Sequence, residues 1–178
     1  MALSATIIKV SINVADMDRQ YYQSHALTLA QHPSETAERV ILRLLAFALH
    51  ASEALTFTRG LSTDDEPDLW QNSLTGDIEL WIELGQPTEK RIRKACGRAQ
   101  QVTVYSYGRS ADPWWRQLQA QLTRFDNLAV FHIPQIASKQ LEAFYSRNID
   151  MQVNIQDGEA TVHCNGESVT VVPEKLFK

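Results

Sequence analysis

Asp68 and Glu83 are the carboxylates of this chain whose positions could hold a metal ion against a phosphate group. Asp68 follows a proline at the expected start of a strand, and Glu83 lies 15 positions later (83 − 68) in the alternating run 78–84. A short hairpin would bring the two carboxylates together. Mg²⁺ binds to a few carboxylates together with water and substrate phosphate, and it can polarise a phosphoryl oxygen. The basic segment that follows, with Arg91 and Lys94, could meet the phosphate.

Both carboxylates also have ordinary structural explanations. Asp68 belongs to the acidic run 64–68, and such runs are usually solvated loops. Glu83 shares one face of its strand with Glu79, and both side chains would face water if the strand lay at a sheet edge. If the strand were central, they would lie under a helix or in a cleft, where two close anions repel each other and one pKa rises. The sequence leaves both alternatives open.

The helical segments carry the remaining charged candidates. Glu38 shares a helical stripe with apolar residues, so its carboxylate is expected to be partly buried and to need a partner. The helix dipole and the adjacent Arg39 could supply that partner locally. On the helix that starts near residue 87, Lys94 falls opposite the apolar stripe and would be solvated. Arg91 falls at the edge of the stripe and could reach toward the strand.

The composition is that of a globular protein of one domain. The chain has 178 residues, of which 44% are hydrophobic and 21% charged. Its formal net charge of −4 argues against wholesale non-specific binding to nucleic acid but allows a local basic patch. No apolar run approaches the roughly 18 residues of a membrane span, no secretory signal is recognised, and the two cysteines show no metal-ligand spacing. These features predict a cytoplasmic protein without a membrane partner.

Apolar periodicity predicts a mixed α+β (α/β) fold with a core of helices and strands and an accessory sheet. The chain opens with two alternating strands and closes with three, which are joined by Asp-Gly and Asn-Gly turns typical of hairpins. We expect the opening hairpin (about 1–30) and the closing meander (about 149–178) to form one accessory antiparallel sheet beside a core at about 31–148, within a single domain 1–178. The expected core elements are a helix at 34–50 capped by Ser34, strands at 55–58, near 68 and at 78–84, a helix from 87, a strand at 102–107, a helix at 112–122, a strand at 128–133 and a helix at 138–145.

Several segments of the chain closely resemble the YaeQ family of bacterial proteins. They are MAL at 1–3, HPSET at 32–36, DEPDLW at 65–70, IELWIELGQP at 78–87 and RIRKAC at 91–96. The resemblance spans essentially the whole chain, and its motifs are specific. The YaeQ family is in turn similar to the PD-(D/E)XK nuclease superfamily, which has the restriction-endonuclease-like fold. This resemblance implies a core with the order helix, three strands, helix, strand, and the elements expected between 34 and 107 match that order.

The resemblance also implies roles for single residues. Members of the superfamily use a Pro-Asp, an acid-x-Lys on the next strand and often a Glu on the first helix, and the acids hold Mg²⁺. Here Pro67-Asp68 matches the first element, Glu83 the acid of the second, and Glu38 the helix glutamate. Gly85 stands where the lysine should be, so a charge that hydrolysis normally uses is missing.

Two functional hypotheses follow. In the first, the protein is a Mg²⁺-dependent phosphodiesterase, a nuclease-like hydrolase acting on DNA or RNA. Its catalytic residues would be Glu38, Asp68 and Glu83, with Asp68 and Glu83 as the metal ligands. Arg91 and Lys94 would bind nucleic acid, and one of them could replace the missing lysine, although the helical wheel does not favour Lys94 for this role. In the second, the protein is a non-catalytic binding or regulatory protein on a nuclease scaffold, in line with the transcription-elongation association that the family carries. A third reading is a soluble protein with an unrelated partner.

Overall fold

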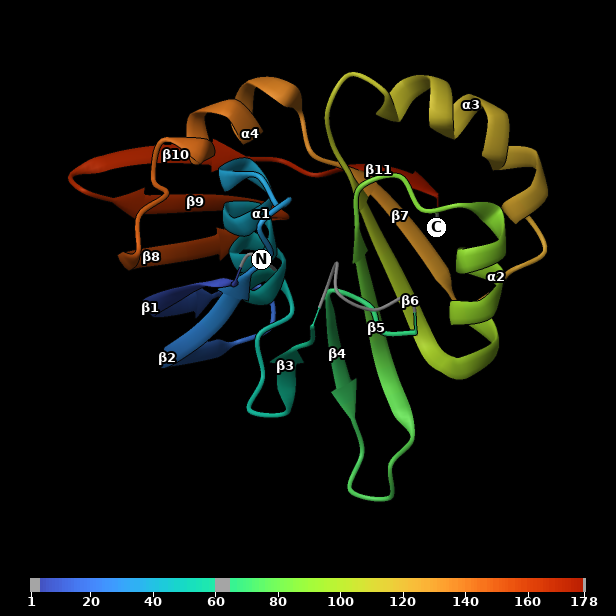
Figure 1. Cartoon of the computed structure of the whole chain (residues 1–178), viewed down its shortest axis with the longest axis horizontal. Helices are drawn as coiled ribbons and strands as arrows, with labels where there is room; N and C mark the ends of the chain where they lie inside the picture. Colours follow the sequence, from blue (N-terminus) through green and yellow to red (C-terminus); the bar gives the residue numbers. More distant parts are fainter. Residues whose placement is uncertain (1–3, 60–64, 178) are drawn as a thin grey trace.

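The structure, a computed structural model, describes residues 4–59 and 65–177. Within these residues the chain forms two mixed sheets and four helices, which are stacked in layers (Figure 1). A five-stranded sheet forms one outer layer, and α1 (Ala37–Leu49) and α4 (Gln135–Glu142) pack against its inner face. A six-stranded sheet follows, and α2 (Glu89–Arg98) and α3 (Ala111–Leu122) cover its far face. The predicted mixed α+β class is confirmed.

The five-stranded sheet joins the two ends of the chain. Its strands, in spatial order, are β10 (Glu167–Val171), β9 (Glu159–Cys164), β8 (Asn148–Gln156), β1 (Thr6–Asp16) and β2 (Tyr21–Gln31). The hairpin and the meander are present as predicted, but the prediction of a wholly antiparallel sheet is wrong, because β1 and β8 pair in parallel. Alternation of side chains, which predicts the strands, is the same for both directions of pairing. The direction is set by the connection through α4, which brings β8 to the end of the sheet where β1 begins.

The six-stranded sheet carries the candidate site. Its spatial order is β11 (Glu174–Phe177), β7 (Leu128–His132), β6 (Ala99–Ser106), β5 (Ile78–Leu84), β4 (Leu69–Asn72) and β3 (Leu55–Phe57). The crossover helices α2 and α3 make β5, β6 and β7 parallel, while β3, β4 and β5 form an antiparallel meander. β5 is therefore central, which excludes the sheet-edge alternative for Glu83. The last strand, β11, pairs with β7, so its predicted place in the accessory sheet is wrong.

Two threonine caps set the starts of the helices next to the site. The N–H and the hydroxyl of Ser34 both contact the ring of His32, so Ser34 is not the cap that the sequence predicts. Thr36 takes that role and accepts from the N–H of Arg39, so α1 begins at residue 37. Thr88 caps α2 in the same way and accepts from the N–H of Arg91. The caps fix the first helical turns, from which both arginine side chains extend.

Two hydrophobic cores hold the layers together. The larger core surrounds α1 and includes residues of both sheets, such as Ile12 and Ile82. The smaller core lies between the six-stranded sheet and the helices α2 and α3, around Trp81 and Ile92. β5 contributes to both cores, with Ile82 on one face and Trp81 on the other. Any polar side chain near the end of β5, such as Glu83, must therefore find its partners inside the protein.

Candidate functional site

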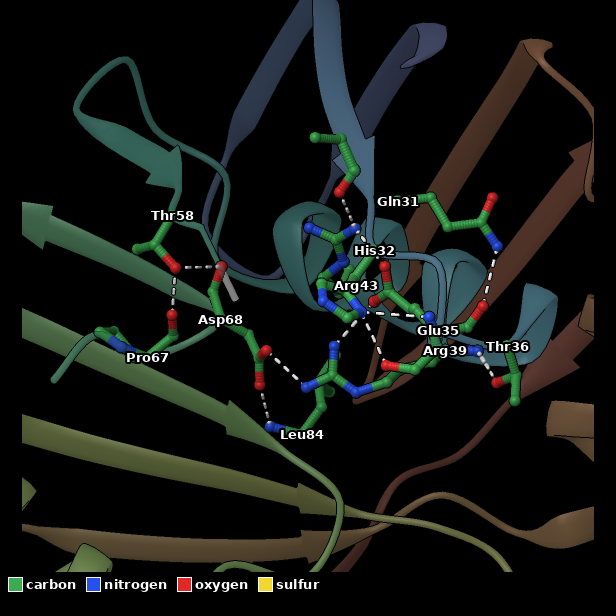
Figure 2. Close-up of polar contacts among 12 residues, drawn as sticks. Gln31, His32, Glu35, Thr36, Arg39, Arg43, Thr58, Pro67, Asp68 and Leu84 are labelled. Atoms are coloured by element: carbon green, nitrogen blue, oxygen red, sulfur yellow. Dashed lines mark hydrogen bonds and ion pairs between the residues drawn. The ribbon is translucent and has the colours of Figure 1, made fainter. Parts of the chain in front are cut away.

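Asp68 lies immediately before β4 and beside the end of β5, with only 3% of its surface exposed. Its N–H donates to the carbonyl oxygen of Ile82 at 3.0 Å, which fixes its position along β5. The N–H of Leu84 donates to Oδ2 at 2.7 Å, and Arg39 of α1 donates to Oδ1 at 2.5 Å (Figure 2). Both oxygens of this predicted metal ligand thus accept hydrogen bonds, one of them from a cation.

Arg39 belongs to a buried arginine–carboxylate network, which consists of Glu35, Arg39, Arg43 and Asp68 (Figure 2). Glu35 accepts from Arg39 through Oε2 and from Arg43 through Oε1, each at 2.7 Å. The charges of the two carboxylates and the two guanidiniums cancel, and their attraction offsets the free-energy cost of removing each charge from water. Burial by itself lowers the pKa of Arg39, but Asp68 and Glu35 outweigh burial and raise that pKa. The guanidinium therefore stays charged.

Glu35 and Arg43 are site candidates that the sequence prediction misses, although a signal for them exists. Glu35, Arg39 and Arg43 are spaced four residues apart with the acid first, which is the favoured order for helical ion pairs. Arg43 also interrupts an otherwise apolar run and is 2% exposed in the structure. A buried guanidinium needs acceptors, and Arg43 finds them in Glu35 and in the carbonyl of Ala30 at 3.0 Å.

Glu83 lies on the face of β5 that is turned toward α2, and 5% of its surface is exposed. Its Oε1 accepts from Nε of Arg91 and from the indole N–H of Trp81, both at 2.9 Å. Burial raises the pKa of Glu83; the bond from Arg91 opposes this rise and the charge of Asp68 adds to it. Asp68 and Glu83 are therefore neighbours, as the hairpin predicts, but each carboxylate turns to an arginine of a different helix.

Among the described residues, Glu38 takes hydrogen-bond and ion-pair partners from α4. Its Oε2 accepts from the hydroxyl of Ser138 at 3.1 Å and lies 3.5 Å from Nζ of Lys139. Both partners belong to α4, and the Glu38 side chain is 12% exposed. The carboxylate is partly buried and partnered, as its place on an apolar stripe indicates, and these two contacts link α1 to α4. They do not bring it to Asp68 or Glu83.

Gly85 ends β5 with a backbone conformation that disfavours the lysine of the superfamily motif. Its φ is +101°, in the region that residues with a Cβ rarely adopt. Space does not explain the glycine, because a Cβ built there would meet no atom within 4 Å. The N–H of Gly85 donates to the carbonyl of Tyr105 at 2.9 Å, which holds this conformation against β6. The absence of the lysine is thus part of the local backbone geometry.

Arg91 and Lys94, the predicted nucleic-acid-binding residues, hold a segment of their own chain. Nη2 of Arg91 donates to the carbonyl of Glu66 at 2.7 Å, in addition to its bond with Glu83. Nζ of Lys94 lies 2.5 Å from Oδ1 of Asp65, and both side chains are largely exposed. Arg98 donates to the carbonyl of Asp65 at 2.7 Å. We call these contacts of Arg91, Lys94 and Arg98 with residues 65–66 the α2 clamp.

The donor set at Asp68 and Glu83 does not fit a magnesium ion in this arrangement. Mg²⁺ requires near-octahedral oxygen ligands that are free to coordinate it. Here one guanidinium stands at each carboxylate, and both Asp68 oxygens already accept hydrogen bonds. Among the residues 4–59 and 65–177, no group of three or more His, Cys, Asp or Glu side chains is arranged to hold a metal ion.

In the same residues, no helix has both the length and the apolar character that a membrane span requires.

Comparison with known proteins places this geometry in a family. The family model described as "YaeQ protein" matches residues 1–173. The "Uncharacterized protein YaeQ" of Salmonella typhi is 50% identical over 159 residues, which cover 89% of this chain and 88% of the relative. The protein of the same name from Escherichia coli strain K12 is 48% identical over 159 residues, with the same two shares.

Two solved structures agree with the fold. The YaeQ protein from Xanthomonas axonopodis pv. citri has a TM-score of 0.94 and 47% identity, covering 97% of this chain and 98% of its own. The YaeQ protein from Pseudomonas syringae has a TM-score of 0.94 and 34% identity, covering 98% of this chain and 97% of its own. On the family model, the sequence identities and the shared fold, the chain belongs to the YaeQ family.

Proposed function

We propose that the protein is a non-catalytic, nucleic-acid-binding member of the PD-(D/E)XK nuclease-like superfamily. The order α1, β3, β4, β5, α2, β6 supports the superfamily assignment, since it follows the helix, three strands, helix, strand order of the restriction-endonuclease-like core. The observation that carries the functional proposal is the pairing of each motif acid with its own arginine, Asp68 with Arg39 and Glu83 with Arg91. The arginines neutralise the charges that a metal ion would otherwise neutralise.

The same arrangement argues against hydrolysis. A metal ion at Asp68 would have to displace a guanidinium held at 2.5 Å and the N–H of Leu84. Removing one partner of a buried ion pair is expensive, typically about 3–5 kcal/mol. The motif lysine, which would stabilise charge on the phosphate, is replaced by Gly85, whose backbone conformation disfavours any side chain.

The basic surface of α2 supports nucleic acid as the ligand. The helix sequence EKRIRKACGR holds five basic residues and one acidic residue, a formal charge of +4 (5 − 1) on a chain whose net charge is −4. Lys90 is exposed, and the side chains of Arg93 and Lys94 are 54% and 51% exposed. A local cluster of exposed cations attracts the phosphates of a nucleic acid to its own face, while the negative charge of the rest of the protein disfavours their contact with other faces.

A matched pair of charge reversals tests the nucleic-acid-binding proposal. Fluorescence anisotropy with a labelled single-stranded DNA oligonucleotide should give a salt-dependent affinity for the native protein. Lys90→Glu should weaken binding at least about threefold near 50 mM salt. It should also reduce the slope of log affinity against log salt concentration by the amount expected for about one phosphate contact. Lys9→Glu, an exposed lysine on β1 of the other sheet, should leave binding unchanged.

Two results would overturn the proposal. Equal effects of the two reversals, or no binding by the native protein at low salt, would remove the case for α2 as a nucleic-acid surface. Cleavage of the oligonucleotide that requires Mg²⁺ or Mn²⁺ and is lost in Glu83→Gln would instead establish a metal-dependent phosphodiesterase. In that case the roles first assigned to Glu38, Asp68 and Glu83 would apply.

A further inference from the structure

The α2 clamp places negative and carbonyl oxygens of the chain itself on the basic helix. Arg91, Lys94 and Arg98 are separated by three and four residues, so they lie along one face of α2. Their three acceptors are the carbonyl of Glu66, the carboxylate of Asp65 and the carbonyl of Asp65, at 2.7, 2.5 and 2.7 Å. Every cation of this face therefore contacts residues 65–66.

The dimensions of this face suit a strand of nucleic acid. Seven residues of helix separate Arg91 from Arg98, a rise of about 10 Å along the axis. A nucleic-acid strand in a duplex carries one phosphate about every 3.4 Å of axis, so about three phosphate steps span the same length. Residues 65–66 present their oxygens to the face that would meet those phosphates.

The three cations differ in how firmly their contacts hold them in place. Arg91 is anchored in the protein, because it also bonds to the buried Glu83 and its side chain is 26% exposed. The Lys94 and Asp65 side chains are 51% and 79% exposed, so water and salt screen their pair. Lys94 holds the pKa of the Asp65 carboxyl below its usual range, which keeps that group charged. Lys94 can thus exchange its oxygen partner for another, while Arg91 stays in place.

We infer that residues Asp65 and Glu66 act as an internal competitor, which occupies the Lys94 and Arg98 end of a phosphate-binding face and weakens its binding of nucleic acid. This inference rests on the proposed function and adds regulation to it. Phosphate oxygens bind Lys94 only when the Asp65 carboxylate gives way. Any change that removes the charge of Asp65 opens the face without altering the helix.

The test compares two isosteric substitutions that remove one negative charge each. Asp65→Asn removes the competing carboxylate, and Asp77→Asn removes an exposed carboxylate in the turn between β4 and β5. With a labelled single-stranded DNA oligonucleotide and anisotropy between about 50 and 200 mM salt, Asp65→Asn should bind about three- to tenfold more tightly than the native protein. Its salt dependence should steepen by about one phosphate contact, whereas Asp77→Asn should stay within about twofold of the native affinity.

A third variant and the native protein separate the possible failures. Adding Lys94→Gln to Asp65→Asn should abolish the gain, because the released cation is then absent. If the native protein binds DNA but Asp65→Asn binds no better than Asp77→Asn, the internal competitor is refuted and the proposed function stands. If the native protein does not bind DNA at low salt, the proposed function is refuted and the inference with it.

Discussion

Replacing Arg39 by Met should lower the free energy of unfolding by about 3–5 kcal/mol, the usual effect of removing one partner from a buried ion pair. Arg39 bonds to both acids of the arginine–carboxylate network, Asp68 at 2.5 Å and Glu35 at 2.7 Å. Met keeps much of the aliphatic side chain but leaves Asp68, whose side chain is 4% exposed, without its cation. Urea denaturation measures the loss.

An exposed arginine provides the matched control for this change. Arg116→Met on α3 removes an ion pair of 2.9 Å with Asp112, but the two side chains are 74% and 69% exposed. Pairs of this kind contribute about 0–1 kcal/mol. A double-mutant cycle with Asp68→Asn should show coupling of about 1–3 kcal/mol, because Asn removes the charge that Arg39→Met strands. A loss in Arg39→Met no larger than in Arg116→Met would contradict the account.

Replacing Arg91 by Met should destabilise the protein more at pH 8 than at pH 5. Burial already raises the pKa of Glu83, and the bond from Arg91 limits that rise. Without Arg91 the pKa of Glu83 rises further. Below the ordinary glutamate pKa, the Glu83 carboxyl is neutral in the folded and unfolded states, so the variant has no unpaired buried charge and this part of the destabilisation vanishes. Above the raised pKa of the folded state, the carboxyl is charged in both states. The folded variant then carries the full free-energy cost of burying an unpaired carboxylate.

The expected difference between the two pH values is about 1–3 kcal/mol, since each unit of pKa shift corresponds to about 1.4 kcal/mol. Urea denaturation of the native protein and the variant at both pH values measures it. Arg93→Met on the same helix is the control, because Arg93 is 54% exposed and lies 3.5 Å from Glu89. The explanation fails if Arg91→Met loses the same stability at both pH values, or gains stability as the pH rises.

The elements that position the site were largely predictable from local pattern. The strand at 78–84 agrees with β5 residue for residue, because the alternation of apolar and polar side chains is strict there. The start of α1 was not predicted, since Ser34 and Thr36 are both good caps and only the ring of His32 decides between them. The parallel pairing of β1 with β8 and the return of β11 to β7 depend on connections that strand patterns do not encode.

At the site, the positions of the acids could be predicted from the sequence better than their partners could. The hairpin that places Asp68 beside β5 follows from a spacing of 15 positions, but the partners of the acids come from elsewhere in the fold. Arg39 is 29 residues from Asp68, and nothing in the sequence specifies that contact. The pair of Glu83 and Arg91 is more local, eight residues apart, and the helical wheel already places Arg91 toward the strand. The wheel predicts Lys94 to be solvated, and its exposure agrees, although the contact with Asp65 could not be foreseen.

Arg39 and Arg91 pair with Asp68 and Glu83, so we expect no metal ion to bind at these two carboxylates. A calorimetric titration with Mn²⁺, with nucleic acid absent and present, compares the native protein with the double variant Asp68→Asn, Glu83→Gln. The two proteins should give the same heats under both conditions, because the carboxylates are already committed to Arg39 and Arg91. Saturable binding of Mn²⁺ by the native protein that disappears in the double variant would overturn this explanation and establish a metal site at these two acids.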